Sequence, residues 1–151
     1  MRFIRIITAT MLAGGLVVGG FTGPGADRAE AAVVSKKVAY KAVKVAAKQK
    51  GDPYRYGANG PGSFDCSGLV QYAYKKAGKK ISRTSSSQMK NYRKISKKNK
   101  RAGDIIIFHR NGRAYHAAIY AGKGRIWEAQ RPGTRVKKTK IWSSRYVVRR
   151  P

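Results

Sequence analysis

The sequence predicts an α+β domain in which helices near the N-terminus pack on an antiparallel β-sheet. Two observations favour this class. Apolar residues recur at helical spacing in two segments of the first half of the chain, residues 38–47 and 69–77. In the second half, short apolar segments are separated by glycine-containing turns, a pattern typical of a meander of antiparallel strands.

The first predicted helix, residues 38–47, is amphipathic. Its apolar positions follow i, i+3/i+4 spacing, and lysines occupy the other face. Ser35 is placed to cap the start of this helix, and Gly51 is placed to end it. Because the apolar face consists of alanine and valine and lacks bulky anchors, we interpret this segment as a helix packed on the domain and not on a membrane surface.

The second predicted helix carries the only cysteine of the chain, Cys66, in its first turn. It follows a turn-rich run of glycines and prolines, residues 51–62, and Gly78 supplies its stop signal. Asp65 or Ser63 is expected at the N-cap. The helix dipole and the free backbone N–H groups at this position favour the thiolate, which is the nucleophilic form of cysteine.

The rest of the chain predicts one short helix and four strands. Residues 79–100 are polar and basic, and the serine-rich run 85–88 can open a short helix. Two interpretations of this run stay open, a cap with a linker or a lining of a substrate groove. His109 is expected in a loop, and the basic segment 145–151 is expected to fray. Strands are predicted at residues 105–108, 115–121, 125–129 and 136–142.

The length of 151 residues fits one domain preceded by a secretory signal peptide. A basic start, the apolar segment 6–18 and the site Ala29-Glu30-Ala31 have the pattern of such a signal. We expect cleavage after Ala31, which removes residues 1–31 and leaves residues 32–151 with no transmembrane segment. A retained membrane anchor is the alternative.

The net charge is +28 at pH 7, from 34 Lys and Arg residues against six acidic residues. Three of the basic and two of the acidic residues precede residue 32, so the cleaved chain would carry a net charge of +27. Such a field attracts polyanions, for example teichoic acids, anionic lipid surfaces or nucleic acid, but selects no particular one. One cysteine excludes an internal disulfide, and with one cysteine and two histidines a structural zinc site is not expected. No cofactor is expected either.

Four acidic residues follow residue 31, and in so basic a chain each is expected to have a role. Asp52 and Asp104 lie in turn sequences, and Asp65 adjoins the cysteine. Glu128 lies in an apolar run, where an unpaired charge would be costly. Glu128 is therefore expected to have a partner.

A nucleophilic cysteine needs a base, and the two histidines, His109 and His116, are the candidates. His116 on the second predicted strand is preferred, because His109 is expected in a loop without a paired acid. A hairpin centred on Gly122 places His116 directly opposite Glu128. Glu128 would then accept a hydrogen bond from one ring nitrogen of His116, which leaves the other nitrogen for Cys66. The inference depends on the register, because a one-residue slip would send the two side chains to opposite faces.

These residues by themselves leave a structural interpretation open. A single cysteine is often a buried small hydrophobic residue, and a His–Glu pair is often a surface ion pair. Trp127 and Trp142 are interpreted as core or groove aromatics and not as a cofactor site.

Six motifs give a more specific indication of function than the single residues do. They follow one another across nearly the whole of residues 32–151. They are GDPYRYG (51–57), FDCSGLVQ (64–71), RTS with Gln88 (83–88), GDIIIF (103–108), HAAIY with Gly122 (116–122) and RPG with Val136 (131–136). In these motifs the chain resembles the NlpC/P60 family, cysteine peptidases of papain-like fold that act on bacterial cell walls. The resemblance implies that residues 32–151 form a catalytic domain with helices packed on an antiparallel sheet or half-barrel.

The resemblance also implies roles for individual residues. Cys66 is the nucleophile, His116 is the general base, and the Tyr54 hydroxyl binds the developing oxyanion together with the backbone N–H of Cys66. The third catalytic position of the family is most often His and falls here on Glu128, whose carboxylate accepts better than a neutral imidazole and is expected to raise the pKa of His116. The positions implied to line the substrate groove are Asp65, Ser67, Arg83, Thr84 and Ser85.

The implied substrates are peptidoglycan stem peptides, cut between D-glutamate or isoglutamine and the following diamino acid by a secreted or wall-associated enzyme. An amidase that cuts the sugar–peptide link is an alternative within the enzyme class. A non-catalytic cationic protein that binds the wall or nucleic acid is the alternative from another class. Because no separate wall-binding module follows the signal, we expect the protein to adhere by its charge to anionic wall polymers such as teichoic acid. We further expect a monomer with no specific nucleic-acid partner.

Overall fold

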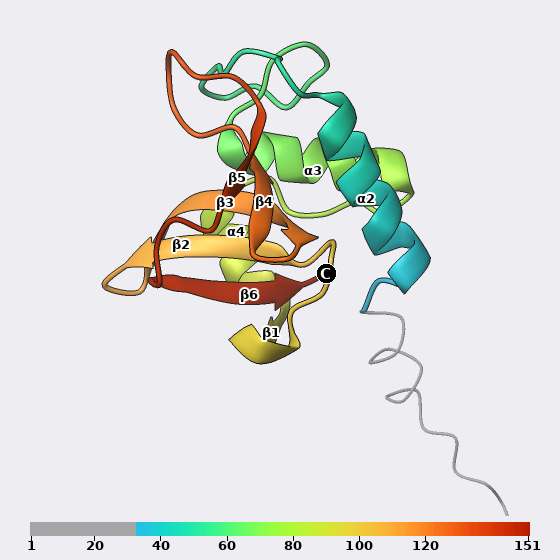
Figure 1. Cartoon of the computed structure of the whole chain (residues 1–151), viewed down its shortest axis with the longest axis vertical. Helices are drawn as coiled ribbons and strands as arrows, with labels where there is room; N and C mark the ends of the chain where they lie inside the picture. Colours follow the sequence, from blue (N-terminus) through green and yellow to red (C-terminus); the bar gives the residue numbers. More distant parts are fainter. Residues whose placement is uncertain (1–32) are drawn as a thin grey trace, which may run out of the picture.

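The computed structural model describes residues 33–151 (Figure 1), so the predicted signal peptide and its cleavage site after Ala31 lie outside the described residues. This part of the chain contains three α-helices, a short 3-10 helix and a six-stranded sheet. None of the helices within residues 33–151 has the length and apolar character needed to cross a bilayer. The predicted α+β class is confirmed.

Helix α2 (Lys36–Lys48) has the predicted position. Ser35 is its N-cap, and the Ser35 hydroxyl accepts a hydrogen bond from the backbone N–H of Val38 at 3.2 Å. The helix lies against α3 and buries only small side chains, which let two helices approach closely. The interpretation as a helix packed on the domain is confirmed. The buried residues are Ala39, Ala42 and Ala46.

Helix α3 (Cys66–Ala77) carries the cysteine at its first position. Asp65, one of the two predicted caps, accepts a hydrogen bond from the backbone N–H of Gly68 at 2.7 Å. The helix ends as predicted at Gly78, whose φ of 100° favours glycine. Gly68 is needed for another reason: a Cβ there would lie 2.1 Å from the carbonyl oxygen of Ala58. The loop before α3 therefore packs directly on the helix backbone.

Helix α4 (Ser85–Asn91) is formed by the serine-rich run. Thr84 caps it, because the Thr84 hydroxyl accepts a hydrogen bond from the backbone N–H of Ser87 at 3.2 Å. The Ser87 hydroxyl accepts in return from the backbone N–H of Thr84 at 3.2 Å, which completes a capping box. The capping interpretation of this run is therefore confirmed.

Six strands form one antiparallel sheet in the order β1-β6-β2-β3-β4-β5. Strands β2 to β5 form the predicted meander, in which each strand pairs with the next along the chain. In Figure 1, helices α2 and α3 lie together on one side of these strands. The strands are β1 (Arg93–Ile95), β2 (Ile105–Arg110), β3 (Arg113–Gly122), β4 (Arg125–Glu128), β5 (Lys137–Lys140) and β6 (Tyr146–Arg150).

The expectation that residues 145–151 fray is wrong, because β6 lies inside the sheet between β1 and β2. Val148 is fully buried opposite Ile106, and Arg150 forms an ion pair with Asp104. The basic side chains lower the hydropathy of this segment, although its alternate positions pack inward. Strand β1 was missed for the same reason, and His109 belongs to β2 and not to a loop.

The predicted register between β3 and β4 is also wrong, by two residues. The chain reverses at Lys123 and Gly124, with φ values of 51° and 68°, and not around Gly122. Two consecutive positive φ values are typical of the two-residue turn that joins antiparallel strands. Tyr120 therefore pairs with Ile126. Because side chains alternate with a period of two, this shift keeps each residue on its predicted face.

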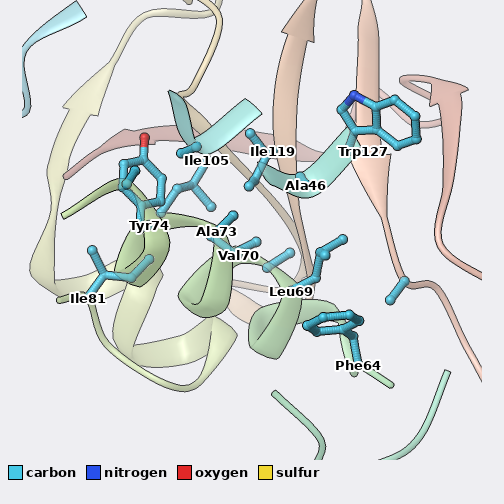
Figure 2. Packing of buried hydrophobic residues seen from close by; sticks show 14 of the residues in the cluster. Ala46, Phe64, Leu69, Val70, Ala73, Tyr74, Ile81, Ile105, Ile119 and Trp127 are labelled. Atoms are coloured by element: carbon cyan, nitrogen blue, oxygen red, sulfur yellow. The ribbon is translucent and has the colours of Figure 1, made fainter. Parts of the chain in front are cut away.

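The core between the helices and the sheet fixes α3 against β3. Figure 2 shows Leu69, Val70 and Ala73 of α3 beside Ile105 and Ile119 of the strands, and all five side chains are fully buried. Complete burial of a valine, leucine or isoleucine side chain contributes about 1.5–3 kcal/mol to the free energy of unfolding. The position of α3 relative to β3 is thus set by packing, and these two elements carry the cysteine and the candidate base.

A smaller buried cluster lies apart from this core. It includes Phe108 of β2 and Tyr146 of β6. The 3-10 helix η1 (Lys97–Asn99) borders it, with the Lys97 ammonium 4.4 Å from the centre of the Tyr146 ring. Lys100 lies in the same way 5.4 Å from the ring centre of Tyr120. Lysines of the polar linker are thus close to the aromatic surface of the sheet.

The loop before α3 is fastened to the loop after β4. The backbone N–H of Tyr54 donates to the carbonyl oxygen of Thr134 at 2.9 Å, and that of Gly51 donates to Val136 at 2.9 Å. Figure 1 shows the two loops side by side, above the sheet in this view. This attachment holds Tyr54 near the N-terminus of α3.

Candidate active site

Cys66 is half-buried at the first position of α3. Its backbone N–H makes no hydrogen bond within residues 33–151, as is usual for the first turn of a helix. Burial raises the pKa of the Cys66 thiol, but the hydrogen bond and the charge of His116 outweigh this effect, so the pKa lies below its ordinary value. The thiolate form is therefore favoured at a position where a free N–H is also available.

His116 lies on β3 and is 3% exposed. Its Nε2 atom lies 2.7 Å from Oε2 of Glu128, which leaves Nδ1 for Cys66. Burial lowers the pKa of His116, but the hydrogen bonds to Cys66 and Glu128 and their negative charges raise it to about 9. The imidazolium form is thus held between two acceptors.

Glu128 is fully buried at the end of β4, and its carboxylate receives three hydrogen bonds. In addition to His116, Thr139 donates to Oε1 at 2.6 Å and the indole N–H of Trp142 donates to Oε2 at 3.2 Å. Burial raises the pKa of Glu128, but the hydrogen bonds from His116 and Thr139 outweigh it and the pKa is lowered. The predicted contact of His116 with Glu128 is present, and in the observed register the two side chains are diagonal neighbours and not directly opposed.

Thr139 and Trp142 were not recognised from the sequence as parts of this site. Thr139 lies on β5, paired with Ile126 of β4, and no local pattern distinguishes it. Trp142 was interpreted as a core or groove aromatic, and its indole does stack on Phe108 with ring centres 4.0 Å apart. Its N–H, however, reaches Glu128. A single acidic residue in an apolar run indicates that hydrogen-bond donors lie on the neighbouring strands. The register between β4 and β5 places Thr139 near Glu128 as such a donor.

Tyr54 lies with Cys66 in the lining of a pocket of about 450 Å³. Burial raises the pKa of the Tyr54 hydroxyl, and the nearby negative charges of Cys66 and Asp65 raise it further. The hydroxyl therefore stays protonated near neutral pH and can donate a hydrogen bond. The predicted placement of Tyr54 beside the nucleophile agrees with this pocket.

The five residues predicted to line the substrate groove all border this pocket. Arg83 donates to both carboxylate oxygens of Asp65, at 2.9 and 2.6 Å, and to the hydroxyl of Ser67 at 3.0 Å. The ion pair neutralises the charges of Arg83 and Asp65 and fixes the two side chains in place. Thr84 caps α4 and also borders the pocket, so the capping interpretation does not exclude the groove interpretation. The five residues are Asp65, Ser67, Arg83, Thr84 and Ser85.

A second, smaller pocket of about 290 Å³ borders His116 and Trp142. It shares only Tyr115 with the first pocket.

Within residues 33–151, no group of three His, Cys, Asp or Glu side chains is arranged to hold a metal ion. The arrangement joins a thiolate, an imidazolium fixed by a buried carboxylate, and two nearby groups that can donate hydrogen bonds, the Cys66 N–H and the Tyr54 hydroxyl. Groups of this kind can carry out nucleophilic attack on a carbonyl.

Comparison with known proteins identifies the family of the chain. The model of the NlpC/P60 family matches residues 51–150. A probable endopeptidase of Corynebacterium glutamicum is 38% identical over 111 residues, covering 74% of this chain and 50% of the relative. The bifunctional muramidase/DL-endopeptidase CwlT of Bacillus subtilis is 41% identical over 95 residues, covering 60% of this chain and 29% of the relative. The chain thus spans half or less of the length of these curated relatives.

Solved structures show the same fold. The NlpC/p60 domain of the peptidoglycan hydrolase SagA matches with a TM-score of 0.67 and 32% identity, covering 75% of this chain and 97% of that domain. The P60 domain of an antigen from M. avium subspecies paratuberculosis matches with a TM-score of 0.69 and 27% identity, covering 76% of this chain and 95% of that domain. The family match extends over most of the described residues and includes both Cys66 and His116, so the chain belongs to the NlpC/P60 family.

Proposed function

We propose that this protein is a cysteine peptidase that hydrolyses peptidoglycan stem peptides at the bond between D-glutamate, or isoglutamine, and the following diamino acid. The observation that carries the proposal is the contact of Cys66 with a His116 that a buried Glu128 orients. Family membership supports the reaction class. The names of two relatives, a DL-endopeptidase and a peptidoglycan hydrolase, support the substrate class.

The first step is acylation of Cys66. The thiolate attacks the carbonyl carbon of the scissile bond, and the resulting oxyanion accepts hydrogen bonds from the Cys66 N–H and the Tyr54 hydroxyl. His116 then donates its proton to the amide nitrogen, the C–N bond breaks, and the amine leaves. The products of this step are a thioester on Cys66 and a neutral His116, still hydrogen-bonded to Glu128.

The second step is hydrolysis of the thioester. Neutral His116 takes a proton from a water molecule, and the oxygen attacks the thioester carbonyl. The C–S bond then breaks, which releases the carboxylic acid product and restores the thiolate and imidazolium. Glu128 keeps its charge throughout and acts by orienting His116 and stabilising its protonated form.

The proposed place of action is outside the cytoplasm, at the cell wall. The predicted signal peptide and the substrate class support this placement. We also propose that the positive charge of the chain attaches it to anionic wall polymers such as teichoic acid. Attachment of this kind weakens as salt screens the charges, so the protein should leave sedimented walls between low and molar salt. Equal binding at both salt concentrations would contradict this part of the proposal.

The reaction is tested by digesting wall muropeptides with the protein and with a Cys66→Ala variant, followed by mass spectrometry of the products. We expect new fragments that end at D-glutamate with the wild type alone. Release of whole stem peptides from the sugar would show an amidase. An absence of products, with binding to walls intact, would favour a non-catalytic binding protein.

A further inference from the structure

The second pocket adjoins the reaction centre but has no role in the steps above. It has a volume of about 290 Å³ and combines aromatic side chains with an arginine and the edge of His116. Its lining residues are Tyr115, His116, Gln130, Arg131 and Trp142.

The position of His116 decides which half of a substrate this pocket receives. The larger pocket contains Cys66 and Tyr54, the groups that meet the scissile carbonyl, so it takes the acyl half. His116 gives its proton to the nitrogen of the leaving half, so that nitrogen must lie next to the imidazole. The pocket that His116 borders is therefore in position for the residue that follows the scissile bond.

The two pockets differ in charge, although each contains one arginine. In the larger pocket the guanidinium of Arg83 is paired with both oxygens of Asp65. Arg131 in the smaller pocket is exposed, and no carboxylate within residues 33–151 forms an ion pair with it. An unpaired guanidinium beside an indole ring is a site for a carboxylate attached to an aliphatic chain.

The backbone of Arg131 is held in place, so the position from which its side chain extends is fixed. Its carbonyl oxygen accepts hydrogen bonds from the backbone N–H of Thr134 at 3.1 Å and from the Thr134 hydroxyl at 2.7 Å. The Arg131 N–H donates to the same hydroxyl at 3.2 Å. The carbonyl of Thr134 in turn accepts from Tyr54, which connects this turn to the larger pocket.

We propose that the smaller pocket binds the diamino acid after the scissile bond, and that Arg131 selects a diamino acid whose side chain ends in a free carboxylate. The aliphatic part of that side chain lies along Trp142, and its carboxylate pairs with the guanidinium of Arg131. Arg131 is a specificity-determining residue in this account and takes no part in the chemical steps. The inference rests on the proposed peptidase function.

The test uses three peptides of the form L-Ala-γ-D-Glu-X, in which X is meso-diaminopimelate, the same residue with its side-chain carboxylate amidated, or L-lysine. For the wild type, kcat/KM for the free carboxylate should exceed that for the amide by about tenfold to a hundredfold, the range for a hydrogen bond to a charged group. In Arg131→Gln this ratio should approach one, through loss of activity on the free carboxylate alone. Arg131→Lys keeps the charge without the planar fork and should retain part of the preference.

Arg125→Gln is the matched control, because Arg125 is an exposed arginine at the start of β4 that does not line the pocket. This variant loses the same charge and should keep the wild-type ratio. Equal kcat/KM for the acid and the amide in the wild type would overturn the inference alone, as would an unchanged ratio in Arg131→Gln. Hydrolysis of none of the three peptides would instead overturn the proposed function, and the inference with it.

Discussion

Two buried carboxylates of this protein, Asp104 and Glu128, have similar surroundings, but the ion pairs that they form differ in what they can do. Asp104 is 1% exposed and Glu128 is fully buried, and each lies 2.7 Å from a basic nitrogen. Asp104 accepts two hydrogen bonds from Arg150 and one from the backbone N–H of Arg101. Glu128 likewise accepts three. Burial and satisfied hydrogen bonds therefore do not distinguish the structural pair from the pair that we propose to be catalytic.

The difference lies in the partner. The guanidinium of Arg150 stays charged at any pH at which the protein is folded, so its pair with Asp104 is permanent and fastens β6 to the start of β2. The imidazole of His116 can lose its proton, and a thiol lies on its other side. A buried carboxylate thus indicates chemistry when its partner titrates and a nucleophile is next to that partner.

The largest expected effect on activity separates the two pairs. In His116→Gln the amide can still donate to Glu128, so the fold should persist, but the proton donor and base is lost. We expect kcat/KM on stem peptides to fall at least about a thousandfold, within the range for removal of a general base. Peptide hydrolysis and thermal unfolding measure the two properties separately. If His116→Gln had a lowered melting temperature but full specific activity, the His116–Glu128 pair would be the structural one, contrary to this account.

The corresponding change in the other pair should affect stability. Asp104→Ala leaves the Arg150 guanidinium, whose side chain is 15% exposed, without its partner. We expect the free energy of unfolding to fall by about 3–5 kcal/mol, as for other broken buried pairs. Urea unfolding measures this change. The folded fraction should keep the wild-type kcat/KM, and a thousandfold loss of activity at unchanged stability would show that Asp104 is part of the site.

A smaller effect on activity is expected for Glu128→Gln. The neutral amide oxygen can still accept a hydrogen bond, but it lacks the negative charge that stabilises a protonated His116. We expect kcat/KM to fall about a hundredfold at neutral pH, the lower range for catalysis by a positioned acid or base. Steady-state kinetics with the same peptides provide the test. A Glu128→Gln variant as active as the wild type would remove Glu128 from the catalytic group.

The two pairs should also differ in their dependence on pH. Because the pKa of His116 is raised to about 9, activity that needs the imidazolium should decline only as pH rises through about 9. The same proton stabilises the folded state fully below the ordinary histidine pKa of about 6.5, and this contribution is lost as pH rises through about 9. In Asp104→Ala the basic limb of the pH–rate profile should not move, whereas in Glu128→Gln it should move to lower pH. Profiles of the three proteins at constant ionic strength decide this, and a limb that stays in place in Glu128→Gln would be the contrary result.

The smallest expected effect concerns Arg150→Lys. This change keeps the charge but loses the two-pronged contact with Asp104. We expect a loss of about 1 kcal/mol in the free energy of unfolding, typical of one hydrogen bond, with no change in kcat/KM. Denaturant unfolding measures this loss. A change in kcat/KM would link the β6 end of the sheet to the reaction centre.

Local signals accounted for the helices and the meander. Ser35, Asp65 and Gly78 mark helix ends through hydrogen bonds and backbone angles that depend on a few neighbouring residues. The expected role for each of the four acids holds for three, whereas the side chain of Asp52 has no partner within residues 33–151. The predicted contact of His116 with Glu128 is present although the predicted register is wrong. A shift of two residues keeps each side chain on the same face of the sheet, so the two side chains still meet.

Contacts between residues far apart in the chain could not be predicted from the sequence. Strand β6 pairs with strands that precede it by about 40 and 50 residues, and basic side chains hide its inward pattern. Trp142 reaches Glu128 only because the chain after β5 folds back over Phe108. Arg131 was part of a recognised motif, but its pocket is formed by residues from three separate parts of the chain. Such features follow from packing of the whole domain and not from local propensity.

The most direct test of the claim that a titrating pair activates Cys66 is the rate of alkylation of this single thiol as a function of pH. In the wild type, reactivity should appear at pH values below the ordinary thiol pKa of about 8.5, because His116 favours the thiolate. It should change again near pH 9, as His116 loses its proton, and in Glu128→Gln this second change should move to lower pH. A single titration at the ordinary thiol pKa, the same in both proteins, would contradict the account.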